Sequence, residues 1–138
     1  MQAFLEEAKR SSRTIANLST AVKNRVLNEM ADALMNHCDF IVTHNEKDMS
    51  EAKLNNLSES LQDRLLLTGD RVKDMADAIR QIASQLEPVG RILDGWVTKD
   101  GLNIQKVSIP IGVIGIIYES RPNVTSDTAA LCFKSGNV

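Results

Sequence analysis

The sequence is short of the residues that mark several classes of protein. It has 2 cysteines in 138 residues, Cys38 and Cys132, far apart and not at metal-ligand spacing. This scarcity argues against a disulfide-stapled secreted domain and against a zinc module, and it fits a reducing compartment. The first residues lack the regions of a secretory signal, and no apolar run approaches the roughly 18 residues of a membrane-spanning helix. We therefore expect a cytoplasmic protein with no membrane partner.

The sequence also lacks an excess of charge of either sign. Its 16 basic and 18 acidic side chains leave a net charge of −2. A protein that binds nucleic acid by neutralising phosphates needs a basic excess, so no nucleic-acid partner is predicted. His37 and His44 lack a suitable acidic or thiol partner, so we expect them at the surface or at helix ends and predict no metal site.

A helical period runs through residues 2–87. An apolar stripe covers 22–34 and has Ser19 or Thr20 before it as a candidate N-cap. The strongest helix is predicted at 70–86, where acidic first turns complement the positive end of the helix dipole.

Between these two helices the pattern is weaker. Residues 39–54 are predicted to form two short helices, with Asp39 and Asn45 as candidate caps. Residues 55–58 are rich in Asn and Ser, which is typical of a loop.

The pattern changes to strands after Pro88. Two extended runs, 89–97 and 102–109, flank a turn that contains Asp100-Gly101. Asp and Gly both tolerate positive φ, so this pair predicts a β-hairpin. An isolated two-stranded ribbon is at best marginally stable, so we expect this one to pair or pack elsewhere.

Residues 111–118 form a near-continuous apolar run, which is typical of a parallel strand covered on both faces. A helix is predicted at 124–134, Gly136 suits its left-handed cap, and Val138 begins a further strand. Parallel strands need a crossover and a second strand beside the first. We therefore interpret the chain as the truncated N-terminal part of a larger α/β protein.

Gly112 and Gly115 lie inside this predicted strand rather than on the turn after it. The dinucleotide fingerprint needs glycines on that turn, so it is absent. We expect the two glycines to allow close backbone packing in the sheet. Cys132, flanked by apolar residues, is expected to be a packed and inert thiol.

The segment 118–125 joins the predicted strand to the helix, where α/β proteins place ligands. It carries a phenol, a carboxylate, hydroxyls, a guanidinium and an amide, and N–H groups at a helix start attract anions. From the residues alone a second interpretation is equally open. Pro122 and its neighbours would then simply start the helix, with Glu119 and Arg121 solvated.

The string Glu-Ser-Arg-Pro-Asn-Val-Thr at 119–125 is long and chemically unusual. It lies in a stretch, 110–125 continuing to 134–137, that closely resembles the γ-glutamyl phosphate reductases of proline biosynthesis, members of the aldehyde dehydrogenase superfamily. Earlier segments resemble the same family, so the resemblance covers essentially the whole chain: 23–27, 57–59, 63–65 and 88–90.

The resemblance implies an α/β fold with a helical layer, a β-hairpin and the first strand and helix of an aldehyde dehydrogenase-like parallel-sheet cofactor domain. Residues 1–87 are then the N-terminal helical part of that domain. Residues 88–109 are a ribbon expected to join subunits of a homo-oligomer, and 110–138 begin the Rossmann-like sheet.

The resemblance also implies the activity of an NADP-dependent oxidoreductase in the full-length protein. A cysteine thiolate attacks the acyl phosphate of L-glutamate 5-phosphate and expels phosphate, and hydride from NADPH then releases L-glutamate 5-semialdehyde. The family's nucleophile lies in a downstream motif that this sequence lacks, and neither Cys38 nor Cys132 matches it. The chain alone is therefore expected to be inactive. The alternative is a non-catalytic fragment that serves only as an assembly module.

The resemblance assigns site residues only to the loop before the predicted helix. Asn123 is the candidate side-chain donor to the oxyanion. The residues that resemble the wall near the nicotinamide half of NADPH are Ile117, Tyr118, Glu119, Ser120 and Arg121.

Overall fold

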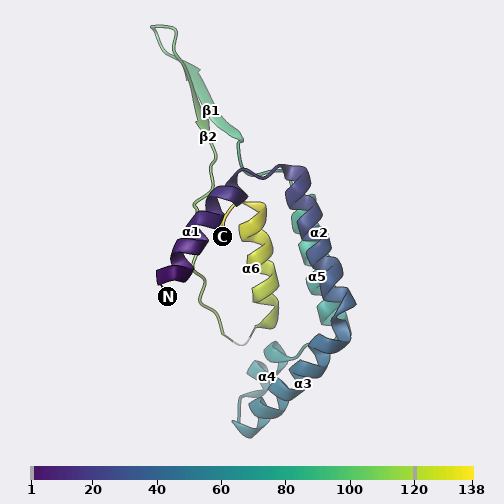
Figure 1. The fold of residues 1–138 in the computed structure, drawn as a ribbon. Coiled ribbons are helices and arrows are strands. Elements are labelled where there is room, and N and C mark those ends of the chain that lie inside the picture. Colours follow the sequence, from purple (N-terminus) through teal and green to yellow (C-terminus); the bar gives the residue numbers. More distant parts are fainter. Residues whose placement is uncertain (1, 120) are drawn as a thin grey trace.

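The computed structural model describes residues 2–119 and 121–138. These residues form six helices and an antiparallel ribbon of two strands (Figure 1). In chain order the elements are α1 (Gln2–Ala16), α2 (Thr20–Asn36), α3 (Cys38–Leu54), α4 (Glu59–Leu65), α5 (Gly69–Ser84), β1 (Ile92–Val97), β2 (Asn103–Val107) and α6 (Pro122–Lys134). Within the described ranges, no helix is long and apolar enough to cross a membrane.

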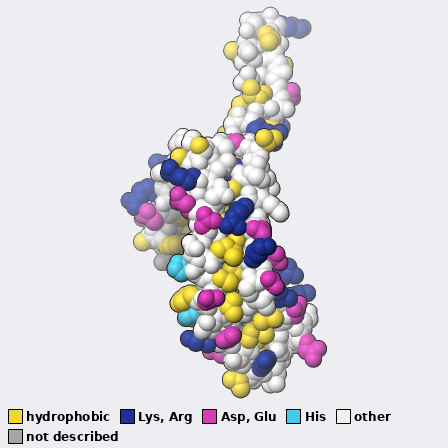
Figure 2. All heavy atoms as spheres, turned by 90° about the vertical axis from the view of Figure 1, so that its right-hand side faces the viewer, with side chains coloured by type: hydrophobic (Ala, Val, Ile, Leu, Met, Phe, Trp, Pro, Cys, Tyr) yellow, Lys and Arg dark blue, Asp and Glu magenta, His cyan; other side chains and the backbone are white. Residues whose placement is uncertain are grey.

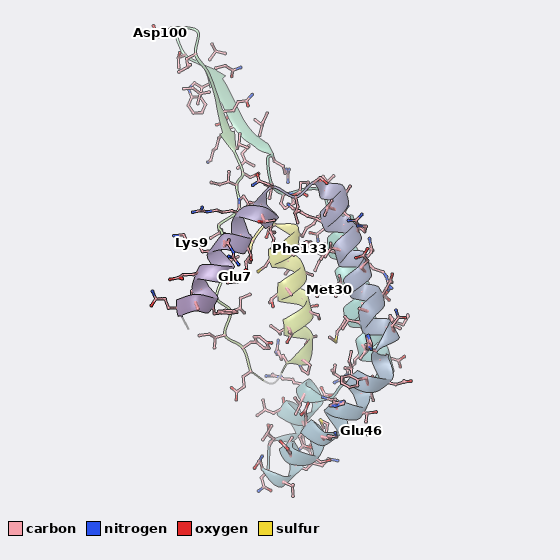
Figure 3. All side chains as sticks on the ribbon, viewed as in Figure 1. Glu7, Lys9, Met30, Glu46, Asp100 and Phe133 are labelled. Atoms are coloured by element: carbon pink, nitrogen blue, oxygen red, sulfur yellow. The ribbon has the colours of Figure 1, made fainter. Side chains whose placement is uncertain are left out.

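Helices α2, α5 and α6 pack together and contain the core (Figure 1). Hydroxyl caps begin two of them, because Ser19 Oγ accepts from the N–H of Val22 and Thr68 Oγ1 from the N–H of Arg71. Several core residues are alanine, whose small side chain lets the helices approach closely. The core comprises Leu27, Ala31, Ala76, Ile79, Ile82, Ala83 and Ala130, with Met30 of α2 and Phe133 of α6 packed against it (Figure 3).

Charged residues lie outside this core. Figure 2 shows basic and acidic side chains interspersed over the face that lies to the right in Figure 1. One ion pair joins α5 to α2, with Arg80 Nη2 2.7 Å from Asp32 Oδ1. Both side chains are partly exposed, so the pair adds little to stability, and the buried alanines and isoleucines hold these helices together.

The predicted pair of short helices at 39–54 is wrong, because α3 is continuous. His37 is the C-cap of α2 and the N-cap of α3, which agrees with the expected helix-end position. Asp39 lies in the first turn of α3. Asn45 belongs to α3, and its side chain is buried against the end of α4. Its Nδ2 donates to the C=O of Leu65 at 2.9 Å, and its Oδ1 accepts from the N–H of Leu67 at 2.7 Å. The amide thus fixes the chain just after α4, a seven-residue helix too short to show a sequence period.

The predicted hairpin is confirmed. β1 and β2 pair in antiparallel register, with Trp96 opposite Ile104 and Val97 opposite Asn103. Gly101 has φ of 83°, as the Asp-Gly turn requires. The ribbon projects away from the helices, with Asp100 at its far end (Figures 1 and 3). All residues of β1 are exposed, so its apolar side chains have no cover among the described residues.

Candidate functional site

The segment between the hairpin and α6 is extended, but the described residues do not form a regular strand there. Its pairing is nevertheless parallel. The N–H of Ile114 donates to the C=O of Val138 at 2.7 Å, and the N–H of Val138 donates to the C=O of Gly112 at 2.9 Å. These two bonds are the pattern of a parallel bridge between Val113 and Val138, which a βαβ unit requires. The predicted cover on both faces is not observed, since Ile111 and Val113 are exposed.

The turn after α6 fixes this pairing. Gly136 has φ of 76°, and a Cβ built on it would lie 2.8 Å from Pro110 Cγ, so both conformation and space favour glycine there. Asn137 Oδ1 accepts from the N–H of Gly112 at 2.7 Å. The expected close packing around Gly112 and Gly115 is wrong, because a Cβ on either would meet nothing within 4 Å among the described residues.

The predicted cofactor residues lie on the exposed turn that leads into α6. Those that the structure describes are Ile117, Tyr118, Glu119 and Arg121. Ser120 lies outside the described residues. The Tyr118 hydroxyl hydrogen-bonds the Thr125 hydroxyl, which ties the loop to the first turns of α6. Ile117 is fully exposed, so this turn offers an apolar surface beside polar groups.

Asn123 lies in the first turn of α6, which begins at Pro122, two residues before the predicted start. Its side chain is exposed, and its Nδ2 donates to Asp127 Oδ2 at 3.0 Å. A side-chain amide has two N–H groups. One of them is therefore oriented by Asp127, and the second is available to a ligand.

A cavity of about 390 Å³ lies where α4 and α5 meet the start of α6. It contains two of the predicted residues, Arg121 and Asn123. Its walls also carry charged residues that the sequence did not predict as site residues: Asp63, Arg64, Arg71, Asp74 and Asp127. Their contribution depends on the packing of α4 and α5 beside α6, for which the sequence shows no signal.

The charged groups of this cavity differ in whether other residues of the protein supply their hydrogen-bond partners. Arg71 Nη1 donates to the C=O of Leu66 at 2.9 Å and to the C=O of Asp63, and its Nη2 donates to Asp63 Oδ1 at 2.7 Å. Arg71 thus holds the chain around α4. Asp127 Oδ1, by contrast, is buried and has no hydrogen-bond partner among the described residues.

A separate cluster of buried charges joins α2 to α6. Lys23 Nζ donates to Glu87 Oε1 at 2.8 Å, and Lys134 Nζ donates to Asn24 Oδ1 at 2.6 Å and to the C=O of Ala83 at 2.9 Å. Burial lowers the pKa of Lys134, against the attraction of Glu87. Burial acts to raise the pKa of Glu87, but the hydrogen bonds from Lys23 and the backbone outweigh it, and the net pKa is lowered. The arrangement of these groups is that of a structural cluster.

The cysteines and histidines lie away from the cavity. Cys38 and Cys132 are half-buried free thiols, and neither lines it. The ring of His44 stacks on Phe40 with 4.1 Å between centroids. Among the described residues no three His, Cys, Asp or Glu side chains are placed to hold a metal ion.

Comparison with known protein sequences gives matches over the whole chain. The chain is 79% identical over 138 residues to the gamma-glutamyl phosphate reductase of Aliarcobacter butzleri and 64% identical to that of a Sulfurovum species. Each match covers 100% of this chain and 34% of the relative. The chain therefore spans about a third of the length of these curated relatives. No family model matches it.

Two solved structures have the same fold. The chain matches the gamma-glutamyl phosphate reductase of Thermotoga maritima with a TM-score of 0.92 and 39% identity, covering 96% of this chain and 32% of that one. The match to the enzyme of Saccharomyces cerevisiae has a TM-score of 0.92 and 33% identity, covering 96% of this chain and 34% of that one.

Proposed function

This chain matches the N-terminal part of gamma-glutamyl phosphate reductases in sequence and in fold, as its sequence predicts, and from that premise we propose that the full-length protein reduces L-glutamate 5-phosphate with NADPH. The products are L-glutamate 5-semialdehyde and phosphate, and the reaction serves L-proline biosynthesis. The single observation that carries the proposal is 79% identity over the whole chain to a relative of that name.

We propose that the catalytic nucleophile lies in the rest of the full-length protein, outside this chain. A cysteine thiolate in the rest of the protein attacks the acyl carbon and expels phosphate, and hydride transfer then releases the aldehyde. Cys38 and Cys132 are half-buried on helices and do not line the cavity, which agrees with this assignment. The 138-residue chain is accordingly expected to be inactive alone.

Asn123 is the proposed oxyanion donor. Its Nδ2 is held by Asp127 at 3.0 Å, which leaves the second amide hydrogen for a developing negative charge on the substrate. A donor fixed in advance costs no reorganisation when the charge develops. Asn123 also lines the cavity, so a substrate bound there would lie against it.

The exposed turn before α6 is the proposed contact for the nicotinamide half of NADPH, which supplies the hydride when bound. Ile117 offers an exposed apolar surface, and the Tyr118 hydroxyl is held by Thr125. Glu119, Ser120 and Arg121 complete the proposed contact set. The parallel bridge at Val113 supports this proposal, because the turn follows the carboxyl end of the bridged segment, and α/β proteins bind nucleotides at such ends.

We assign three parts to the chain, within a protein of the aldehyde dehydrogenase superfamily. Residues 1–87 are the helical part of the cofactor domain, 88–109 a ribbon that joins subunits of a homo-oligomer, and 110–138 the start of the cofactor sheet. The exposed apolar side chains of β1, Ile92, Leu93 and Trp96, support the role of the ribbon.

The same exposed ribbon favours the second candidate, a catalytically inactive module that only assembles. The native mass of the purified chain together with an activity assay separates the two. An assembled chain whose full-length parent lacks reductase activity supports the module, and an active parent supports the reductase.

The test of the proposed function is an assay of the full-length protein with L-glutamate 5-phosphate. We expect one phosphate released and one aldehyde formed for each NADPH oxidised. NADPH oxidation that does not depend on the acyl phosphate, or no oxidation at all, would contradict the proposal.

A further inference from the structure

We propose that the cavity between α4, α5 and α6 binds the amino-acid end of the substrate, with Asp127 holding the α-ammonium group and Arg64 the α-carboxylate. This inference rests on the proposed function and names the recognition residues for its substrate. The volume of about 390 Å³ lies in the range of small-molecule sites. Both signs of charge line it, as a zwitterionic ligand requires.

Asp127 is the residue that most needs a ligand. One carboxylate oxygen, Oδ2, accepts from Asn123, and the other, Oδ1, is buried without a partner among the described residues. A buried charged acceptor without a donor is costly. An ammonium group offers three donors and a full positive charge, so once the Asp127 carboxylate turns Oδ1 toward the cavity, this group would satisfy it with a charge-assisted hydrogen bond.

Two cations of the cavity, Arg64 and Arg121, form no ion pair among the described residues, and of these Arg64 is the one that is not assigned to the cofactor. It lies on α4, lines the cavity and forms no ion pair among the described residues. Arg71, on another wall, is bound to Asp63 and to the backbone at Leu66. A guanidinium group can bind a carboxylate through two parallel hydrogen bonds. Asp127 and Arg64 together therefore complement an α-amino acid.

The structure also offers a competing role for Asp127. Because it accepts from Asn123, it could act only by orienting the oxyanion donor. In that case its loss would lower kcat for every substrate. Recognition of the ammonium group would instead change KM for substrates that carry an amine and leave the others unaffected. The two roles therefore give different kinetics.

The experiment uses the full-length enzyme in the reverse direction, with phosphate and NADP⁺, and two aldehydes. L-glutamate 5-semialdehyde carries the amine, and 5-oxopentanoate has the same carboxylate and aldehyde without it. We expect Asp127→Asn to raise KM for the amino aldehyde about 10- to 100-fold, because a hydrogen bond to a charged group is lost. KM for 5-oxopentanoate should change less than about 2-fold. Cyclisation of the amino aldehyde affects wild type and variant alike, so each aldehyde is compared between proteins.

Arg64→Gln provides the second arm. Because both aldehydes have the carboxylate, we expect KM to rise for both, by about 10-fold. Asp48→Asn is the matched control, since Asp48 is an exposed acid on α3 that does not line the cavity. It should leave the kinetics of both aldehydes unchanged.

The outcomes separate the inference from its premise. A fall in kcat for both aldehydes with unchanged KM would make Asp127 a positioning residue for Asn123 and overturn its recognition role. Unchanged kinetics in Asp127→Asn would also overturn the recognition role of Asp127. If that variant fails to fold, Arg64→Gln remains a test, and an unchanged KM for both aldehydes overturns the cavity assignment. A wild-type enzyme that reduces no NADP⁺ with either aldehyde removes the proposed function itself.

Discussion

Apolar side chains are buried in the helical layer of α2, α5 and α6, whereas many of those in the segment 89–119 are exposed. Ile79 of α5 is 0% exposed, whereas Ile111 is 83% and Ile117 is 102% exposed. The layer also pairs its buried charges, as Lys23 with Glu87 shows. The apolar core of the layer is thus covered by the layer's own residues, while the segment gains stability only when another surface covers it. Folding is therefore assigned to the core of the layer, and the proposed site to the segment together with the cavity where α4 and α5 meet the start of α6.

The sharpest test of this contrast compares one isoleucine from each region. Ile79→Ala should lower the free energy of unfolding by about 3–5 kcal/mol, in the 138-residue chain and in the full-length protein, because it leaves a cavity in the core. Ile111→Ala should change it by less than about 0.5 kcal/mol in the chain but by about 2 kcal/mol or more in the full-length protein. Denaturant unfolding measures both. Equal costs for Ile111→Ala in the two proteins would mean that nothing covers the segment.

The second prediction concerns catalysis at Asn123, an exposed residue in the first turn of α6. Asn123→Ala in the full-length enzyme should lower kcat about 10²- to 10³-fold, as expected for loss of an oxyanion donor. NADPH affinity should stay nearly unchanged, because the interaction strengthens only in the transition state. Steady-state kinetics and a cofactor titration measure the two effects. Asn28→Ala is the control, since that exposed amide donates to Asn24 in its own helix. Unchanged turnover would remove Asn123 from the site.

The third prediction tests the buried charges. Lys23→Met should lower the free energy of unfolding by about 2–3 kcal/mol, because it leaves the partly buried Glu87 carboxylate without its cation. Lys73→Met is the matched control, because Lys73 is exposed and its Nζ forms an ion pair with Asp77 Oδ2, 3.7 Å away on the same helix. Its cost should be below about 0.5 kcal/mol. Similar costs for the two lysines would show that burial does not distinguish them.

The same cluster predicts a pH dependence. The pKa of Glu87 is lowered in the folded protein from its ordinary value of 4.5, so the unfolded chain binds a proton first as the pH falls. The stability that Glu87 contributes is therefore full above pH 4.5 and is lost as the pH falls through the folded pKa. Unfolding measured from pH 7 downward should show a smaller loss in Glu87→Gln than in wild type. Identical pH profiles would contradict this role.

The smallest effect is expected at the junction between the two regions. Gly136→Ala should cost about 1–2 kcal/mol, because Gly136 has positive φ and abuts Pro110. Gly115→Ala, which has open space beside it, should change stability by less than about 0.5 kcal/mol in the chain. Thermal unfolding of the two variants compares them directly. Unchanged thermal stability of Gly136→Ala would contradict this prediction, because the backbone and Pro110 would then have shifted to accept the added Cβ.

Sequence reasoning predicted the parts of the fold whose signals are local. The apolar period and the candidate caps Ser19 and Thr20 predicted α2, which Ser19 caps, and Asp100-Gly101 predicted the hairpin. It failed at α3 because Asn45, a typical cap residue, is instead bound to the backbone after α4, a contact distant in sequence.

The candidate site divides in the same way. Arg121 and Asn123 lie two residues apart at the start of α6, so the sequence could place them together, and the structure adds that both line one cavity. Asp127 and Arg64 come from α6 and α4, and no pattern in the sequence indicates that both line one cavity. Tertiary packing alone brings them to the same cavity.

The most direct test of the account is a parallel assay of the full-length protein and of the 138-residue chain with L-glutamate 5-phosphate and NADPH. The account predicts that the full-length protein oxidises NADPH with release of phosphate, and that the chain, outside which we propose the nucleophile to lie, does not. NADPH oxidation by the chain alone, or none by the full-length protein, would contradict it.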